Sequence, residues 1–272
     1  MTTRPIVGLE DYVELFEACG GTDMPYLRAH FPRYLATLER FLERWDRDTT
    51  GSLLDIGAHW LHQSLLYSLH GFSVTAVDVP TTFEDPHVRA LAEHHRIRLL
   101  ADPLPEQAEA LRTLPDDSFD VVLFTEIIEH ITFNPVAMWR EIHRVLKPGG
   151  HLVVTTPNYY ALRGRAWHWR RFLGGGGSGV EVDELLQLPT FAHHWKEYSL
   201  RELRRYFQRL SEDFACLAAI QTEAYRSSAS HPRLDFAARR IEKWLPPLRP
   251  NLYMHLRLER KECGIGIEPS WS

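Results

Sequence analysis

Residues 53–58 of this chain read Leu-Leu-Asp-Ile-Gly-Ala, and residues 74–78 read Val-Thr-Ala-Val-Asp. The first stretch is typical of a short buried strand that enters a tight turn, and the second of a strand that ends on an acid. Asp78 follows Asp55 at roughly the 20-residue spacing that places an acid at the tip of a neighbouring parallel strand, where it accepts hydrogen bonds from ribose hydroxyls. The pair predicts a nucleoside cofactor; two acids that only end buried strands in another α/β fold would give the same pattern.

The turn after the first strand argues against a dinucleotide. A dinucleotide site needs the pattern G-x-G-x-x-G, which brings backbone amides against a pyrophosphate. Here only Gly57 is present, and Ala58, His59, Trp60 and Leu61 follow it. Because a nucleoside without phosphates does not need that glycine cradle, the sequence favours S-adenosylmethionine (SAM).

Strand and helix patterns alternate along the central part of the chain, which is typical of a parallel sheet with helices on both faces. We therefore predict an α/β, Rossmann-like fold with a seven-stranded, mostly parallel sheet. The predicted strands are 53–56, 73–77, 97–100, 120–124, 151–156, 214–222 and 252–260. The predicted helices are 61–70, 86–95, 105–113, 135–146 and 235–244, and the Lys147-Pro148-Gly149-Gly150 turn ends the fourth of them.

A helical arm precedes the first strand. Its apolar residues recur every three or four positions, which predicts one buried helix face: Leu27, Phe31, Leu35, Leu38, Phe41, Leu42 and Trp45. We expect residues 1–48 to form this arm or lid, with a shorter helix near 9–19, and residues 49–272 to form the main domain. Within that domain, we expect a mobile loop and lid over 162–198, which contains the glycine-rich run 174–179, and a C-terminal insert over 225–250.

Composition excludes several classes of protein. No stretch approaches the roughly 18 apolar residues of a membrane span, and no apolar segment follows the N-terminus, so we expect a cytoplasmic location. Three cysteines lack the spacing of metal ligands and fit a reducing compartment. The net charge of −5 disfavours nucleic acid as a partner. The oligomeric state is not predicted.

Five segments together resemble the class I SAM-dependent methyltransferases, within the group that carries E-x-x-E-H after the fourth strand, K-P-G-G before the fifth and T-T-P-N after it. The segments are LLDIGA (53–58), VTAVD (74–78), DSFDVVLFTEIIEHI (117–131), RVLKPGG (144–150) and LVVTTPN (152–158). Each is weak alone, but five in this order and spacing are specific. The resemblance covers roughly residues 50–210 and leaves the arm and the C-terminal part unmatched.

The resemblance implies where the cofactor binds. The first-strand turn would line the methionine half of SAM, the tip of the second strand would hold the ribose, the turn after the third would contact the adenine, and the lip of the fourth would lie beside the methionine. By position these residues are Asp55, Gly57, Ala58, His59, Asp78, Val79, Asp102, Pro103, Thr125 and Glu126.

One departure from the family concerns the glycine turn. The family pattern is G-x-G-x-G, whereas this chain has His59 and Leu61 at the second and third glycine positions. Either the turn takes another path and still binds SAM, or cofactor binding is weakened. A non-catalytic binding protein with the same fold therefore stays an alternative to the enzyme.

Methyl transfer to a hydroxyl needs alignment of the reactants and a base that takes the proton. A neutral histidine near the fourth strand suits that role, so His130 is one candidate and His194 is the second, with Glu129 beside them. His194 lies in the segment 191–198, where we expect a lid over the substrate. A purely structural role for His130 in helix packing or capping is the competing interpretation.

The same residues suggest a metal alternative. Glu126, Glu129 and His130 would stand at positions i, i+3 and i+4 of one helix face, and His193 or His194 would complete a site for a divalent ion. This arrangement is similar to the small-RNA 3′-terminal 2′-O-methyltransferases. A metal is not expected, because the E-x-x-E-H segment is common in methyltransferases that need none.

The predicted activity is therefore O-methylation by SAM of a small polar metabolite, a glycan or a lipid-linked intermediate. Tryptophans and cations recur in residues 163–171 and 239–245. This pattern is usual for packed surface helices, and peripheral contact with a membrane is the alternative.

Overall fold

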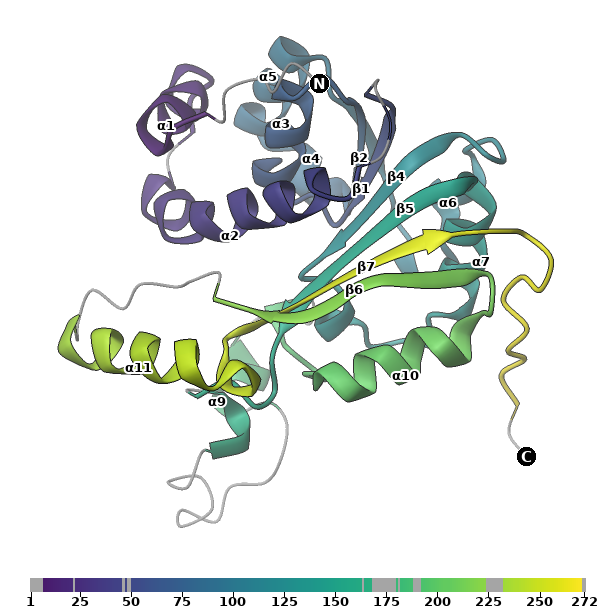
Figure 1. Cartoon of the computed structure of the whole chain (residues 1–272). Coiled ribbons are helices and arrows are strands. Elements are labelled where there is room, and N and C mark those ends of the chain that lie inside the picture. The colour runs from purple at the N-terminus through teal and green to yellow at the C-terminus, as the bar shows by residue number, and fades with distance from the viewer. Residues whose placement is uncertain are drawn as a thin grey trace.

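The computed structural model describes residues 7–21, 23–45, 47, 50–162, 164–167, 180, 182–187, 192–223 and 232–270. Its strands are β1 (Ser52–Ile56), β2 (Ser73–Asp78), β3 (Arg98–Ala101), β4 (Phe119–Thr125), β5 (Leu146–Pro157), β6 (Phe214–Thr222) and β7 (Asn251–Leu258). They form a seven-stranded sheet in the order β3-β2-β1-β4-β5-β7-β6 (Figure 1). Only the pairs that include β7 are antiparallel. The predicted Rossmann-like α/β fold is confirmed.

Helices cover both faces of the sheet (Figure 1). One face carries α1 (Leu9–Ala18), α2 (Met24–Leu42), α3 (His62–Leu69), α4 (Pro80–Phe83) and α5 (Pro86–His95), and the other carries α6 (Glu109–Arg112), α7 (Val136–Val145) and α10 (Leu200–Leu210). The remaining elements are α9 (Val182–Gln187), α11 (Pro232–Trp244) and the 3₁₀ turns η1 (Pro105–Gln107), η2 (Ile128–His130), η3 (Arg165–Trp167) and η5 (Pro246–Leu248). No helix in the described ranges has both the length and the apolar character needed to cross a membrane.

Alternate residues of each strand serve the two cores, as the two-residue period of a strand requires. Leu53 of β1 packs into the core on the α1–α5 side, and Leu54 packs into the core on the α6, α7 and α10 side. Asp55 therefore projects toward the same side as Leu53, where α3 lies. The fold thus places the first predicted site acid under a helix rather than in open solvent.

Helix α2 buries the apolar stripe that the sequence predicts. Leu27, Phe31, Leu38 and Phe41 are almost fully buried in the core on the α1–α5 side. The helix begins at Asp23, whose carboxylate accepts a hydrogen bond from the backbone N–H of Tyr26 at 3.2 Å. Since α2 shares this core with α3, its polar positions are held at fixed places beside the sheet.

The predicted helix over 105–113 is wrong as one element. The chain forms η1, then Ala108 in a left-handed conformation with φ 52°, and then the short helix α6. The carboxylate of Asp102 accepts the N–H groups of Leu104 and Ala110 at 3.3 and 3.4 Å. These bonds fold the segment back over the end of β3, which a continuous helix could not do.

The predicted start of the fifth strand at residue 151 is also wrong, because β5 already begins at Leu146. Leu146 pairs with Phe119 of β4, and the register then shifts at a bulge before Val121 pairs with His151. Gly149 lies inside this bulged stretch with φ 75°, a conformation that glycine adopts without strain. The Lys-Pro-Gly-Gly turn is therefore built into the strand.

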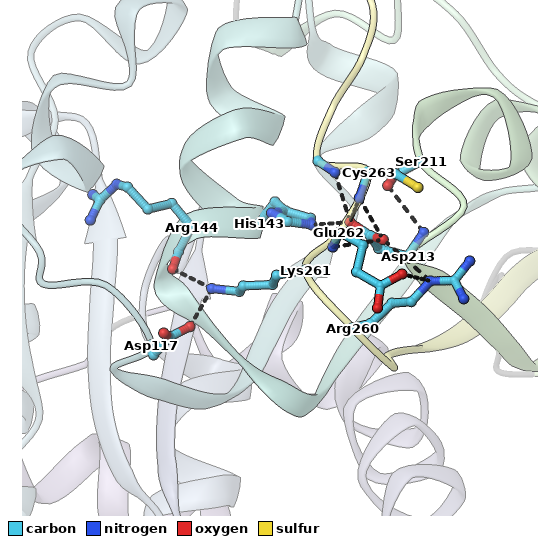
Figure 2. A network of polar contacts seen from close by, with 10 residues as sticks. Asp117, His143, Arg144, Ser211, Asp213, Arg260, Lys261, Glu262 and Cys263 are labelled. Atoms are coloured by element: carbon cyan, nitrogen blue, oxygen red, sulfur yellow. Dashed lines mark hydrogen bonds and ion pairs between the residues drawn. The ribbon is translucent and has the colours of Figure 1, made fainter.

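Asp213 binds the C-terminal segment that follows β7 (Figure 2). Asp213, which precedes β6, has a fully buried side chain and accepts the backbone N–H groups of Glu262, Cys263 and Gly264 at 2.8–3.3 Å. His143 of α7 lies 2.9 Å from the same carboxylate. These hydrogen bonds lower the pKa of Asp213 to about 2 despite its burial.

Candidate active site

The predicted cofactor acids lie at one edge of the sheet. Asp55 lies near the end of β1, Asp78 ends β2, and Asp102 directly follows β3. The strands are parallel, with Asp55 opposite Ala76 and Asp78 opposite Ala101. The acids therefore share the carboxyl edge, next to the place where the strand order reverses between β1 and β4. Ligands of open α/β sheets bind at this edge and at this switch.

Asp55 is buried and only half hydrogen bonded. Its Oδ2 accepts the hydroxyl of Ser64 from α3 at 2.6 Å, while its Oδ1 is buried without a hydrogen-bond partner among the described residues. Burial raises the pKa of Asp55 to about 7. An ammonium group of a ligand beside Oδ1 would supply the missing donor and favour the ionised carboxylate.

Asp78 organises the turn that the sequence singles out. Its Oδ2 accepts the N–H of His59 at 2.7 Å, and its Oδ1 accepts the N–H of Val79 at 2.7 Å and the hydroxyl of Thr82 at 2.9 Å. A carboxylate has about four acceptor positions, so Oδ2 retains capacity for a ligand hydroxyl. Asp78 thus joins the first-strand turn to the start of α4.

The turn keeps a glycine-like backbone at all three positions of the family pattern. Gly57 has φ 75°, His59 has φ 47° and Leu61 has φ 63°. A left-handed conformation costs a non-glycine residue about 1–2 kcal/mol, so His59 and Leu61 hold it at a cost. The turn therefore follows the left-handed path that glycines permit, with larger side chains on it. A Cβ at Gly57 would collide with Cδ1 of Ile127, so a side chain fits there only if Ile127 moves.

The side chains of this turn point into different surroundings. Leu61 is fully buried in the core and Ala58 is buried too. The ring of His59 stacks on Trp60 at 4.2 Å, and Trp60 meets the ring of Tyr26 of α2 edge-on at 5.5 Å. His59 and Trp60 thus form an aromatic group with the start of α2.

The third acid makes local contacts. Asp102 is buried, and burial raises its pKa although Oδ1 accepts two backbone N–H groups of the following segment. Pro103, the next residue, is exposed. Asp102 therefore has a structural role in this turn, and its role in binding stays a prediction.

The end of β4 is held by a residue that the sequence analysis missed. Thr125 is half-buried at the strand end, and Glu126 follows with φ 57° and donates its N–H to the carbonyl of Thr155 at 2.8 Å. The carboxylate of Glu126 forms an ion pair with Arg33 of α2, and both side chains are less than one-fifth exposed. The only signal for Arg33 was its place beside the buried stripe of α2.

The left-handed backbone at Glu126 also corrects a prediction. Glu126, Glu129 and His130 do not share one α-helix face, because only the short 3₁₀ turn η2 follows Glu126. The Oε1 atom of Glu126 is buried without a hydrogen-bond partner among the described residues. Glu126 is thus directed to Arg33 and is not part of the group that gathers around His130.

Glu129, His130 and His194 do come together. One ligand atom of each lies within 4.8 Å of the others, and the rings of His130 and His194 meet edge-on at 4.7 Å. The backbone of the 193–196 segment positions them, since Nδ1 of His130 lies 3.1 Å from the carbonyl of His193 and the N–H of Trp195 donates to the carbonyl of Glu129 at 2.7 Å. His193 therefore contributes its backbone at this site, and His194 contributes its ring.

Glu129 is the buried member of this group. Its side chain is fully buried, its Oε2 accepts the hydroxyl of Thr156 at 2.9 Å, and its Oε1 lacks a hydrogen-bond partner among the described residues. Burial and the nearby charge of Glu126 raise the pKa of Glu129 well above its ordinary value. Perturbed acids of this kind concentrate at functional sites.

Part of the predicted lid lies outside the described residues. The glycine-rich run 174–179 and the positions 163 and 168–171 belong to that part. Trp167 and the 192–198 segment are described, and the latter lies beside η2. Of the predicted lid, the described portion that reaches the site is therefore the histidine segment.

The sequence of this chain is similar to those of known methyltransferases. A family model described as "Methyltransferase domain" matches residues 26–211. Two relatives are each named "Ubiquinone biosynthesis O-methyltransferase". The one from Caulobacter vibrioides is 31% identical over 177 residues, which are 62% of this chain and 64% of the relative. The one from Caulobacter sp. strain K31 is 34% identical over 168 residues, which are 59% and 61%. The chain thus matches less than two thirds of either relative's length.

A solved structure shows the same fold. The S-adenosylmethionine-dependent methyltransferase from Mesorhizobium loti superposes with a TM-score of 0.55 at 19% sequence identity, over 84% of this chain and 97% of that one. At this identity the likeness concerns the fold alone.

Proposed function

This chain belongs to the methyltransferase family whose domain model it matches, and on that premise we propose that it transfers a methyl group from SAM to a hydroxyl of a small polar metabolite. Transfer to oxygen, rather than to nitrogen or carbon, is supported by the names of the two Caulobacter relatives. A glycan or a lipid-linked intermediate as the acceptor belongs to the same proposal. Because one fold supports many activities, the carboxyl edge of the sheet supports this proposal more directly than the fold does.

The observation that carries the proposal is the set of carboxylates at three successive strand ends. SAM presents three kinds of donor: an ammonium group, two ribose hydroxyls and an adenine amine. Asp55 has a buried oxygen that no described residue hydrogen bonds, Asp78 keeps acceptor capacity on Oδ2, and Asp102 follows the neighbouring strand. The residues therefore fit the cofactor in number, chemistry and order.

SAM, when bound, supplies an electrophilic methyl group on a sulfonium. In this proposal the chain holds the cofactor with Asp55, Asp78 and Asp102 and brings the acceptor hydroxyl to the lip of β4. Alignment of two reactants in one site accounts for most of the acceleration that such a displacement needs. Few side chains must then do covalent chemistry.

The remaining requirement is a base for the hydroxyl proton, and we assign it to the group at η2. His130 and His194 present two imidazoles at the lip of β4, and histidine is the side chain that most often serves as a general base. Glu129 lies behind them, with its Oε1 3.9 Å from Nε2 of His130. Burial and the charge of Glu126 raise the pKa of Glu129, and a positive imidazolium at His130 would favour the ionised form of this carboxyl.

Binding of S-adenosylhomocysteine, measured by isothermal titration, tests the cofactor site. We expect Asp78→Asn, which keeps the size of the side chain, and Asp78→Ala to weaken binding by about 1.5–3 kcal/mol, because charge-assisted hydrogen bonds to the ribose are lost. Asp116→Ala, at an exposed acid before β4, is the control and should bind like the wild type. A wild-type protein that fails to bind at submillimolar concentration would overturn the proposal.

Transfer itself needs a separate measurement. A labelled methyl group from SAM should appear in a lysate metabolite only with the active protein, and His130→Ala together with His194→Ala should abolish that transfer while leaving S-adenosylhomocysteine binding intact. Binding without transfer to any metabolite would instead support the non-catalytic alternative.

A divalent metal at Glu129, His130 and His194 is the second candidate for the same group. The convergence of one buried carboxylate and two imidazoles within 4.8 Å favours it. Against it stands Glu126, the fourth predicted ligand, which pairs with Arg33. If a metal activates the hydroxyl, EDTA abolishes turnover and Mg²⁺ or Mn²⁺ restores it. If EDTA does not change turnover, the metal is ruled out and a histidine remains the candidate base. A metal-dependent RNA 2′-O-methyltransferase would also need an RNA substrate, which the charge of −5 disfavours.

A further inference from the structure

Helix α11 presents large apolar side chains to solvent. Trp244 is 79% exposed, Phe236 is 63% exposed and Leu245, just after the helix, is 51% exposed. The opposite side of the helix is anchored, because Ala238 and Glu242 are buried. The exposed apolar residues thus lie on a fixed face, which we call the α11 face: Phe236, Ile241, Trp244 and Leu245.

Cations border the α11 face. Arg240 lies over the ring of Phe236 at 5.7 Å from its centroid, and Arg239 and Lys243 are exposed on the helix surface next to it. Glu242, between Ile241 and Lys243, is buried on the other side. An apolar face beside cations is the pattern of a helix that lies in the plane of an anionic membrane surface.

The α11 face is joined to the edge of the sheet that carries the site. β7 begins beside the end of β5, where Asn251 pairs with Pro157. Asn158 donates from Nδ2 to the carbonyls of Pro247 and Arg249 at 2.9 and 2.8 Å, and the N–H of Leu162 donates to the carbonyl of Leu248 at 2.9 Å. These bonds fix the end of α11 and η5 against the carboxyl end of β5 (Figure 1).

More exposed aromatic rings lie on the chain that leaves β5. Tyr159, Tyr160 and Trp167 are all exposed, and Trp167 donates its Nε1–H to the carbonyl of Tyr160 at 3.2 Å. Tyr and Trp are favoured where one side of a ring meets apolar chains and its polar group meets water. Two segments that are far apart in the sequence therefore expose interfacial residues at the same edge.

We propose that the α11 face docks on a membrane surface that carries anionic lipid headgroups, so that the carboxyl edge of the sheet faces the bilayer. The occupant is chosen by charge complementarity: the apolar residues enter the acyl boundary, and Arg239, Arg240 and Lys243 meet the headgroups. This inference goes beyond methyl transfer and stands without it, since it uses no residue of the cofactor site.

Sedimentation with sucrose-loaded vesicles tests the proposal on the full-length chain. Phosphatidylcholine vesicles with one-quarter phosphatidylglycerol should pellet the wild-type protein, and pure phosphatidylcholine vesicles should pellet much less. Replacing both Trp244 and Leu245 by Ser should reduce partitioning by at least about tenfold, because the buried apolar area is lost. Lys243→Glu should reduce it by at least about fivefold on the anionic vesicles alone.

The control is Leu217→Ser, which removes an apolar residue that is 40% exposed on β6, outside the α11 face. It should partition like the wild type. All variants should unfold at the same denaturant concentration as the wild type, which shows that they fold and keeps this test separate from the methyltransferase proposal. If the wild type stays in the supernatant, or the α11 variants pellet as it does, the proposal is wrong. Sedimentation velocity tests whether a second copy of the chain binds the α11 face instead. If the wild type is a dimer that does not bind vesicles, and replacing Trp244 and Leu245 dissociates it, the face is a contact between copies and the membrane proposal is wrong.

Discussion

The two edges of the sheet treat buried carboxylates in opposite ways. At the amino edge, Asp120 and Asp213 are surrounded by donors, and these hydrogen bonds hold both pKa values at about 2. At the carboxyl edge, burial raises the pKa of Asp55 to about 7, and burial with the charge of Glu126 raises that of Glu129 well above its ordinary value. The residue types are alike; the supply of donors differs.

This difference separates structural acids from acids that are available to a ligand. The described chain contains three buried carboxylate oxygens without a hydrogen-bond partner, and they belong to Asp55, Glu126 and Glu129. All three follow or end β1 and β4, the two strands at the topological switch. An unpartnered buried carboxylate oxygen costs free energy, and among the described residues the proposed ligand site would offset that cost at these two strand ends.

The largest expected effect is at the amino edge. Asp213→Ala should lower the free energy of unfolding by about 3–5 kcal/mol, because three backbone N–H groups and His143 lose a buried charged partner. Chemical denaturation at pH 7 measures it. Glu262→Ala, on the same segment but with an exposed side chain, is the matched control and should stay within about 0.5 kcal/mol of the wild type.

The same acid predicts a direction with pH. Its folded-state pKa of about 2 lies below the ordinary aspartate value, so its contribution is complete above that ordinary value and disappears as the pH falls toward 2. The wild type should therefore lose stability between about pH 4 and pH 2 more steeply than Asp213→Ala. Parallel curves for the two proteins would show that the network does not stabilise the ionised acid.

The second effect concerns the ion pair between the arm and the site. Arg33→Met should destabilise the protein by about 2–3 kcal/mol, because Glu126 is left as a buried charge. Adding Glu126→Gln should recover most of that loss, and Glu126→Gln alone completes the double-mutant cycle by thermal or chemical denaturation. Additive losses would mean that the two side chains do not stabilise each other.

The third effect has the opposite sign from the first. The folded-state pKa of Asp55, about 7, lies above its ordinary value, so its ionised form penalises the fold above pH 7 and the penalty vanishes below about pH 4. Asp55→Asn should therefore stabilise the protein by about 1–2 kcal/mol at pH 8, less than the full penalty because the amide also lacks a partner. At pH 4 the gain should disappear.

The functional readout of Asp55→Asn completes this comparison. The variant should bind S-adenosylhomocysteine more weakly although it is more stable, which is the expected trade-off for a site residue. Asp116→Asn, at an exposed acid, should change neither property. If Asp55→Asn destabilised the protein at pH 8, Asp55 would belong with the structural acids of the amino edge.

The sequence predicts most of the residues at the carboxyl edge, but not all of their contacts. The positions of Asp55, Asp78 and Asp102 follow from local strand patterns, because the carboxyl ends of parallel strands lie at the same edge of the sheet. The grouping of Glu129, His130 and His194 was also predicted, and their ligand atoms converge.

The missed features depend on tertiary structure. The left-handed backbone of Glu126 has no local signal, since a glutamate between Thr125 and Ile127 usually continues a regular element. Arg33 was missed because its partner comes from β4, far along the chain, and the same side chain would look solvated on an isolated helix. The donors around Asp213 are backbone N–H groups of the C-terminal segment, and side-chain patterns cannot predict such contacts.

The smallest effect tests whether the amino edge is redundant. Asp120 accepts the N–H and the hydroxyl of Ser52, both at 2.9 Å, and pairs with Arg47 and with Lys147, the latter at 2.8 Å. Lys147→Met removes one donor of several, and its ammonium is partly exposed, so the loss should not exceed about 1 kcal/mol by chemical denaturation. Lys196→Met, in an exposed pair with Glu202 and above the ring of Tyr198, sets the baseline for a lysine at the surface. A loss of 2 kcal/mol or more for Lys147→Met would show that the carboxylates of the amino edge depend on single partners, as Asp55 depends on Ser64. The two edges would then differ in which donor each carboxylate has, and not in the number of its donors.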